Sequence, residues 1–175
     1  FMRSEGWVGE DLQAHGRNGE WKISDPGMRW PVLDGYLEAA DEIGVRKTHD
    51  YNSGDNEGVQ YFQSLILKGR RQSAAKAFLY PVTDRPNLTV VTGAMVDRVV
   101  TQDRRATGLV YRRGGETVTA KARREVILCA GAYGTPALME RSGIGQAERV
   151  KALGLEVVHD LPGVGENLQD HWHIR

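Results

Sequence analysis

An uninterrupted apolar run that stops at a glycine constrains the fold of this chain more than any other feature. Residues 126–130 read Val-Ile-Leu-Cys-Ala, and Gly131 follows them. A run without polar alternation is typical of a strand that is covered on both faces in a parallel sheet, so Cys129 is expected in the core. Thr135 and Pro136 then suit the cap and the first residue of a short helix. The sequence therefore predicts a strand, a glycine turn and a helix.

This predicted unit is a candidate ligand site. In open parallel sheets, ligands bind beyond the carboxyl ends of the strands, where a helix N-terminus presents free amide N–H groups to an anion. The small residues Ala130, Gly131, Ala132 and Gly134 would let a cofactor diphosphate or ribose approach the backbone closely. A plain strand-to-helix turn explains the same residues equally well, so both interpretations stay open on these grounds.

The remaining patterns predict a mixed α/β (α+β) chain. A helix with one buried face is expected over residues 31–43, and Ser73 can cap a second, short helix. An antiparallel β-meander is expected where Gly114 and Gly115 join two strands in a hairpin. The strands are predicted over residues 20–23, 59–65, 88–92, 95–101, 107–112, 117–122 and 156–159, and a further helix over residues 146–153.

Composition excludes several classes of protein. Lys plus Arg and Asp plus Glu number 23 each, so no net charge draws the chain to nucleic acid. The single cysteine rules out an internal disulfide framework and a cysteine-rich metal site. No stretch reaches the ~18 apolar residues of a membrane span. The first residues lack the pattern of a signal peptide, and a cytoplasmic protein whose natural beginning lies further upstream is expected.

Residues 131–145 carry a specific resemblance to a known family. Small residues, a Thr-Pro pair, two aliphatic residues and a terminal Ser-Gly-Ile-Gly occur in one spacing. This stretch is similar to the second signature of the glucose-methanol-choline (GMC) oxidoreductases, which include choline dehydrogenase and glucose oxidase. The resemblance covers nearly the whole chain, with further matching segments at residues 1–5, 69–79, 86–99 and 162–171.

The resemblance implies an FAD-dependent enzyme that oxidises a primary alcohol to an aldehyde by hydride transfer to the flavin. Part of a Rossmann-like FAD-binding domain would come from residues 86–165, and part of the GMC substrate domain from residues 1–85 and 166–175. An alcohol substrate and an electron acceptor, oxygen or another, are the implied partners. The implied FAD contacts are Val96, through its backbone, and Ala130, Gly131, Ala132 and Thr135.

Two parts of the family's site have no match in this sequence. The family's Gly-x-Gly-x-x-Gly fingerprint would lie upstream, and its active-site His downstream, so the chain resembles an internal fragment that is expected to be inactive alone. No catalytic residue is assigned. His171 and His173 make a poor metal site without further ligands, and solvent-facing roles suffice for His15, His49 and His159.

Alternative functions remain open at this level. A scaffold that keeps the sheet but binds no flavin would also fit the missing segments. A nicotinamide-dependent dehydrogenase is less favoured, because the meander interrupts the βαβ alternation. Choline, an aromatic alcohol, a polyol and an aliphatic alcohol all stay possible as substrates.

Overall fold

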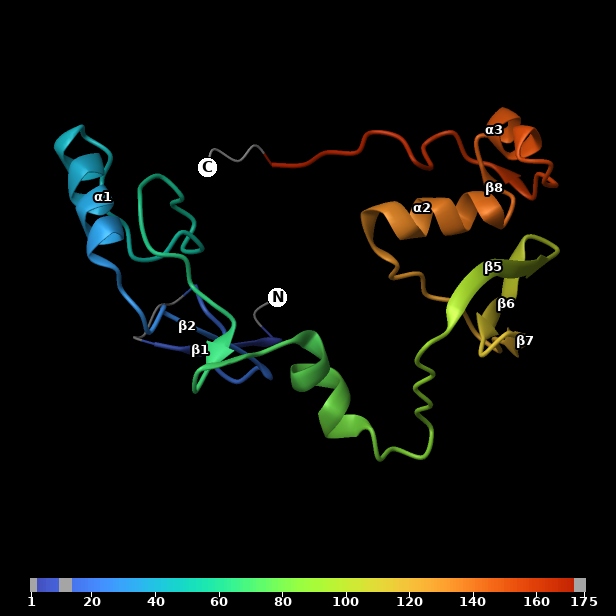
Figure 1. Ribbon diagram of the computed structural model, residues 1–175, viewed down its shortest axis with the longest axis horizontal. Coiled ribbons are helices and arrows are strands. Elements are labelled where there is room, and N and C mark those ends of the chain that lie inside the picture. Colours follow the sequence, from blue (N-terminus) through green and yellow to red (C-terminus); the bar gives the residue numbers. More distant parts are fainter. Residues whose placement is uncertain (1–2, 10–13, 172–175) are drawn as a thin grey trace. The chain divides into compact units, whose positions relative to one another are not determined.

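The computed structural model describes residues 3–9 and 14–171, which form two compact units, Phe1–Val90 and Val91–Arg175 (Figure 1). Each unit is described by itself below. The predicted meander and all of the predicted helices are present, with bounds that differ in part from those expected. Among the described residues, no helix is both long and apolar enough to cross a membrane.

The N-terminal unit is built on two short strands that pair in parallel, β1 (Glu5–Val8) and β2 (Trp21–Ser24). The strand predicted over residues 20–23 is thereby confirmed as β2. Trp7, on β1, is buried. A helix, α1 (Pro31–Glu42), follows β2, and the unit continues through a hairpin and two short helical turns. These later elements are β3 (Ile66–Leu67), β4 (Arg70–Arg71), η1 (Ala75–Leu79) and η2 (Tyr80–Val82).

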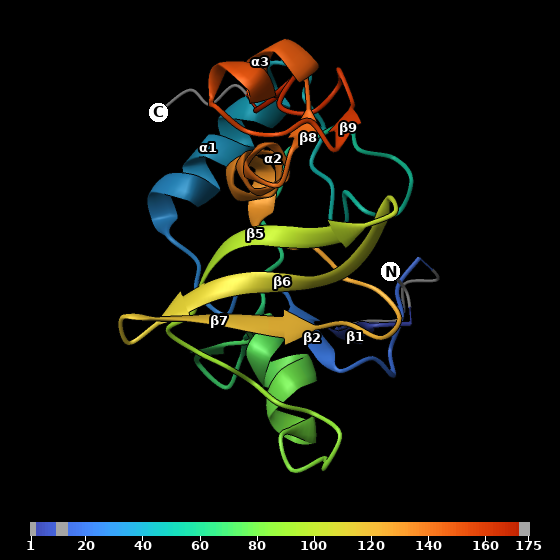
Figure 2. The same cartoon turned by 90° about the vertical axis from the view of Figure 1, so that its right-hand side faces the viewer.

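The C-terminal unit begins with the antiparallel meander of β5 (Met95–Gln102), β6 (Arg105–Arg113) and β7 (Glu116–Lys121) (Figure 2). Gly114 and Gly115 form the predicted hairpin turn with φ angles of 58° and 86°, and glycine adopts such left-handed angles without steric cost. The β5–β6 turn uses Asp103 and Arg104, which take φ angles of 50° and 61° despite their side chains.

Helix α2 (Gly131–Arg141) packs on β5 through its C-terminal turn. The buried hydroxyl of Ser142 accepts a hydrogen bond from the Val99 N–H at 2.8 Å and donates one to the Leu138 carbonyl at 2.6 Å. Leu138 and Val99 are both buried beside these bonds. Since Ser142 satisfies a backbone donor inside the core, it fixes the end of α2 against the meander.

The chain after α2 folds back beside that helix. Strand β8 (Ile144–Gly145) pairs in parallel with β9 (His159–Asp160), and α3 (Ala147–Ala152) connects them. Val150, on α3, is fully buried. The predicted helix over residues 146–153 is confirmed, whereas the strand predicted over residues 156–159 is shorter and shifted toward Asp160.

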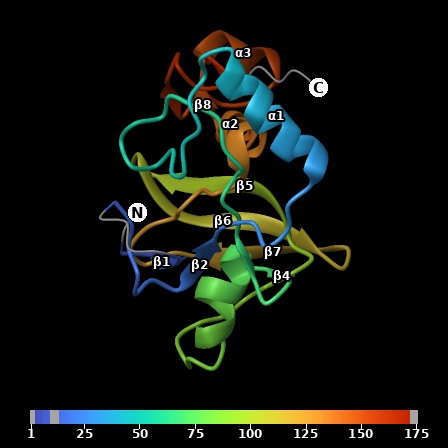
Figure 3. The ribbon, with the colours of Figure 1, turned by 90° about the vertical axis from the view of Figure 1, so that its left-hand side faces the viewer.

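Helix α1 differs from its prediction in one respect. The helix itself (Figure 3) matches its predicted bounds to within one residue, with Pro31 at the first position and Gly44 beyond the end. All twelve of its residues are nevertheless at least partly exposed. Tyr36, on the predicted buried face, is 66% exposed. Helical spacing shows which face is apolar, but it does not show that another part of the chain covers that face.

Apart from the apolar run, two predicted strands are absent. Residues 88–92 form no strand, and residues 59–65 make only single bridges, one between Ser24 and Ser64 and one between Lys47 and Val59. Both stretches have residues typical of strands. Neither lies beside a partner strand for more than one bridge among the described residues, and backbone pairing is what completes a strand.

The largest difference between prediction and structure concerns the apolar run at residues 126–130, which was expected to form a buried strand. Nothing in the described ranges pairs with it as a strand, and Ile127 is 74% exposed. Cys129 is exposed as well, so its expected place in the core is wrong for this chain. A strand covered on both faces therefore stays a prediction for the longer protein, because the described residues supply no strand that pairs with this segment.

Candidate nucleotide-binding site

The N-terminal turn of α2 is the candidate site. The helix begins at Gly131, five residues before the predicted first residue, and Pro136 lies inside it. Pro136 is the sixth residue of the helix, so its missing N–H leaves the Ala132 carbonyl without the donor that an interior helical residue normally supplies. The Thr135 hydroxyl accepts a hydrogen bond from the Ala130 N–H at 3.1 Å. Thr135 therefore fastens the incoming chain to the helix without acting as its cap.

The electrostatics of this turn suit an anion. The amide N–H groups of the first turn have no partner within a helix, and they give its N-terminus a partial positive charge. The first turn of α2 contains no acidic residue that would neutralise this charge. Gly131, Ala132 and Tyr133 are exposed. A phosphate group could therefore reach these amides directly.

Space at the turn is open as well. A Cβ atom added at Gly131 would meet no atom within 4 Å, so side chains of the described residues do not close this corner. The φ angle of 81° at Gly131 nevertheless favours glycine. Gly134 is tighter, since a Cβ there would lie 3.0 Å from the Cβ of Ala130. Glycine is thus required for the turn at one position and for close packing at the other.

A groove of about 490 Å³ runs along one side of α2. The helix supplies one wall, with Ala132, Tyr133 and Pro136, and the segment of residues 163–169 supplies the other. Arg149 also lines the groove and bonds Glu140 at 3.1 Å and Glu166 at 2.9 Å. The hydrogen bond that Arg149 donates to Glu140, followed by the one that it donates to Glu166, raises the pKa of Arg149. The Arg149 guanidinium therefore connects the two walls of the groove, through Glu140 of α2 and Glu166 of the facing segment.

The five predicted contact residues fall into two groups. Ala130, Gly131, Ala132 and Thr135 lie together at the start of α2, and of these Ala132 lines the groove. Val96 lies on β5, where its carbonyl accepts a hydrogen bond from Arg141 at 3.4 Å. Arg141 ends α2, so the two groups are associated with opposite ends of a helix that is about 15 Å long. Only an elongated ligand could contact both.

Sequence reasoning missed two features. Tyr133 and residues 163–169 line the groove, and only the glycines of the latter segment hinted at a close backbone approach. The second miss is His15, which was expected to face solvent but is buried, with 6% of its surface exposed. His49, His159 and His171 are exposed, whereas His173 lies outside the described residues. Within residues 3–9 and 14–171, no group of three or more His, Cys, Asp or Glu side chains is arranged to hold a metal ion.

An FAD diphosphate fits the start of α2, because free amides, an open corner and an unneutralised helix end coincide there. The residues that would hold it are Gly131, Ala132 and Tyr133, through their backbone N–H groups. These features recognise a phosphate group and do not by themselves distinguish one nucleotide from another.

Known proteins resemble this chain over most of its length. An oxygen-dependent choline dehydrogenase of Pectobacterium atrosepticum is 43% identical over 90% of the chain, and one of Rhizobium etli is 42% identical over 95%. Among solved structures, a pyridoxine 4-oxidase from Mesorbium loti matches 98% of the chain with a TM-score of 0.91 and 34% identity. An FAD-dependent oxidoreductase from Chaetomium thermophilum matches 97% with a TM-score of 0.90 and 30% identity.

The chain spans only part of these relatives. It covers 28% of the Pectobacterium protein and 29% of the Rhizobium protein, and 34% and 32% of the two solved chains. These likenesses confirm the expected fold class, a mixed α/β chain related to Rossmann-like FAD-binding domains, and FAD as the cofactor of the family. Since the family model for GMC oxidoreductase also matches residues 23–173, the chain belongs to the GMC oxidoreductase family.

Proposed function

We propose that the protein containing this chain is an FAD-dependent oxidoreductase that converts a primary alcohol to an aldehyde. The observation that carries the proposal is the open, unneutralised N-terminus of α2, in a chain that belongs to a family of oxidoreductases. Bound FAD would supply the hydride acceptor. Oxygen or another acceptor would then remove the electrons.

In this proposal the described residues bind and position the cofactor and take no part in proton transfer. The first-turn amides of α2 hold the diphosphate, and Thr135 fixes the chain that leads into them. Ser142 and Arg141 hold the other end of α2 against β5, which keeps Val96 at a constant distance from the phosphate site. A base that removes the hydroxyl proton is expected outside this sequence.

We further propose that residues 86–165 belong to the FAD-binding domain, while residues 1–85 and 166–175 belong to the substrate domain. The division of the chain into compact units between Val90 and Val91 supports a boundary near residue 85. The second proposed boundary lies between residues 165 and 166. Residues 163–169 form one wall of the groove beside α2, so both proposed domains contribute to this wall.

Choline is the first substrate to test, since relatives that are 42–43% identical are named oxygen-dependent choline dehydrogenases. A neutral primary alcohol is the second, because the similar pyridoxine 4-oxidase acts on a different compound by its name.

The test uses the protein expressed from its complete reading frame. The purified protein should be yellow, release FAD on denaturation, and lose its flavin absorbance when an alcohol substrate is added without oxygen. NAD should not replace FAD. A colourless protein that takes up no added FAD would contradict the proposal and favour a scaffold that binds no flavin. A yellow protein whose flavin is reduced by NADH but by none of the alcohols would contradict the proposed reaction alone.

A further inference from the structure

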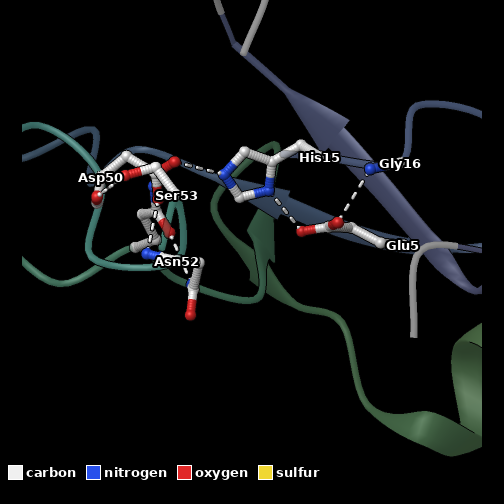
Figure 4. Close-up of polar contacts among 7 residues, drawn as sticks. Glu5, His15, Gly16, Asp50, Asn52 and Ser53 are labelled. Carbon is white, nitrogen blue, oxygen red and sulfur yellow. Dashed lines mark hydrogen bonds and ion pairs between the residues drawn. The ribbon is translucent and has the colours of Figure 1, made fainter. Parts of the chain in front are cut away.

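A buried histidine in the N-terminal unit lies between two carboxylates. His15 Nδ1 lies 2.7 Å from Glu5 Oε1, and His15 Nε2 lies 3.1 Å from Asp50 Oδ2 (Figure 4). None of the three residues is more than 6% exposed. Glu5 belongs to β1, whereas Asp50 follows α1 at a separation of 35 residues from His15. The imidazole ring therefore bridges two parts of the unit that are distant in sequence.

The contacts of both carboxylates fit a charged ring between them. An ionised carboxylate only accepts hydrogen bonds, and a neutral imidazole has a single N–H donor. Both contacts of the ring are satisfied when each of its nitrogens carries a proton. The remaining negative charge is met by backbone donors, the Gly16 N–H to Glu5 at 2.9 Å and the Asn52 N–H to Asp50 at 2.9 Å.

Electrostatics favour the same protonation state. Burial alone lowers the pKa of His15, and this is the largest single influence on it. The hydrogen bond and charge of Glu5, together with those of Asp50, outweigh burial and raise the pKa above the ordinary value of 6.5. Among the residues that the structure describes, the groups that bear on the ring are thus Glu5 from β1, Asp50 from the loop between α1 and β3, and the uncharged indole of Trp7.

Trp7 connects this cluster to a cavity. Its indole stacks on the His15 ring with a centroid distance of 4.5 Å and an interplanar angle of 17°. Trp7 also lines a cavity of about 500 Å³, together with Leu37, Lys47 and Tyr61. The ring that bonds both carboxylates therefore also supports one wall of this cavity.

We propose that Glu5, His15 and Asp50 form a protonation-dependent clamp. The doubly protonated ring holds β1 to the turn at Asp50 and keeps Trp7 in the cavity wall, and loss of one ring proton loosens both contacts. In the unfolded chain, His15 has the ordinary pKa of about 6.5. Because its pKa is higher in the folded unit, the stabilisation is complete below about pH 6.5 and is lost as pH rises through the folded value.

The test uses the full 175-residue chain with isotope-labelled histidine. Five histidines give a small set of signals, and His15→Gln identifies the one that belongs to His15. That signal should titrate above about pH 6.5, with both ring nitrogens protonated below the transition. Trp7 fluorescence, obtained by subtracting the Trp7→Phe chain, should change over the same pH range, because a protonated ring quenches a stacked indole.

Stability gives a second readout. In urea unfolding, the folding equilibrium of the N-terminal unit should weaken as pH rises through the folded pKa, by about tenfold for each pH unit by which that pKa exceeds 6.5. His15→Gln should abolish this dependence, while the control His159→Gln, at an exposed histidine of the other unit, should preserve it.

A further variant keeps the test decisive if His15→Gln does not fold. Asp50→Asn retains a hydrogen-bonding partner of similar shape and removes one charge, so it should bring the His15 titration closer to pH 6.5. The proposal is overturned if His15 titrates at or below pH 6.5 in the unsubstituted chain. It is also overturned if Trp7 fluorescence does not follow the histidine signal.

Discussion

Strand β6 and residues 126–130 share a strong β-forming pattern, yet only β6 forms a strand. Its neighbours β5 and β7 lie directly before and after it in sequence, joined by two-residue turns. Residues 126–130 have no such adjacent partner, and Ile127 remains exposed where Val110 of β6 is buried. In the meander, the pairing of β6 is therefore completed by partners that adjoin it in sequence, in agreement with the small entropic cost of closing short loops.

The largest expected effect is that of a charge placed in the meander. Val110 is 4% exposed, so Val110→Asp should destabilise the C-terminal unit by at least about 3 kcal/mol, because it buries an unpaired carboxylate. Ile127→Asp should change the free energy of unfolding by no more than about 0.5 kcal/mol in the 175-residue chain. Urea unfolding followed by circular dichroism measures both. Equal changes in the free energy of unfolding for the two variants would contradict the inference that β6 is buried while residues 126–130 are not.

Ile127→Asp should have a different effect on stability in the longer protein. If residues 126–130 join a parallel sheet there, as the pattern predicts, Ile127→Asp should become destabilising by several kcal/mol in the protein from the complete reading frame. An unchanged stability in both contexts would refute the prediction of a buried strand.

A smaller effect is expected at the contact between α2 and β5. Ser142→Ala leaves the buried Val99 N–H without its partner and should cost about 1–3 kcal/mol. Thr135→Val removes a comparable bond to the Ala130 N–H, but Ala130 is exposed and water can replace the hydroxyl. Its cost should stay below about 1 kcal/mol. Thermal unfolding of the two variants measures the difference, and an inverted order would contradict the assigned role of Ser142.

The smallest predicted effect concerns the β5–β6 turn. Arg104 holds a φ angle of 61°, which costs a residue with a Cβ atom about 1 kcal/mol. Arg104→Gly should therefore stabilise the meander by up to about 1 kcal/mol, whereas Arg105→Gly, at the first residue of β6, should destabilise it by up to about 0.5–1 kcal/mol. Chemical denaturation of the two variants should give shifts of opposite sign. Shifts of the same sign would show that the turn angle does not limit stability.

Sequence patterns predicted the elements whose causes are local. Gly114 and Gly115 specify a turn by their own backbone freedom, and Pro31 and Gly44 bound α1. The start of α2 was misplaced because Thr135 and Pro136 resemble a cap, whereas the left-handed angle at Gly131 sets the boundary. Ala130, Gly131, Ala132 and Thr135 could be grouped from sequence because they belong to one continuous signature, and their contact with FAD stays a prediction.

Contacts between distant residues were not predictable. His15 lies in a polar stretch, and its burial depends on Asp50, which is 35 residues away. The groove likewise joins Ala132 to residues 163–169 across α3. Neither juxtaposition has a periodic signal, because each is created by how the chain folds back on itself.

The most direct test of the proposed cofactor site compares Ala132→Glu with Ala132→Gln in the protein expressed from its complete reading frame. Both side chains have similar size at an exposed position in the first turn of α2. The Glu variant should bind FAD about tenfold more weakly than the Gln variant, since its carboxylate would lie beside the phosphates. It should be equally stable or more stable, by about 0.3–1 kcal/mol, because an anion favours a helix N-terminus. Equal FAD affinities for the two variants would contradict a diphosphate at the start of α2.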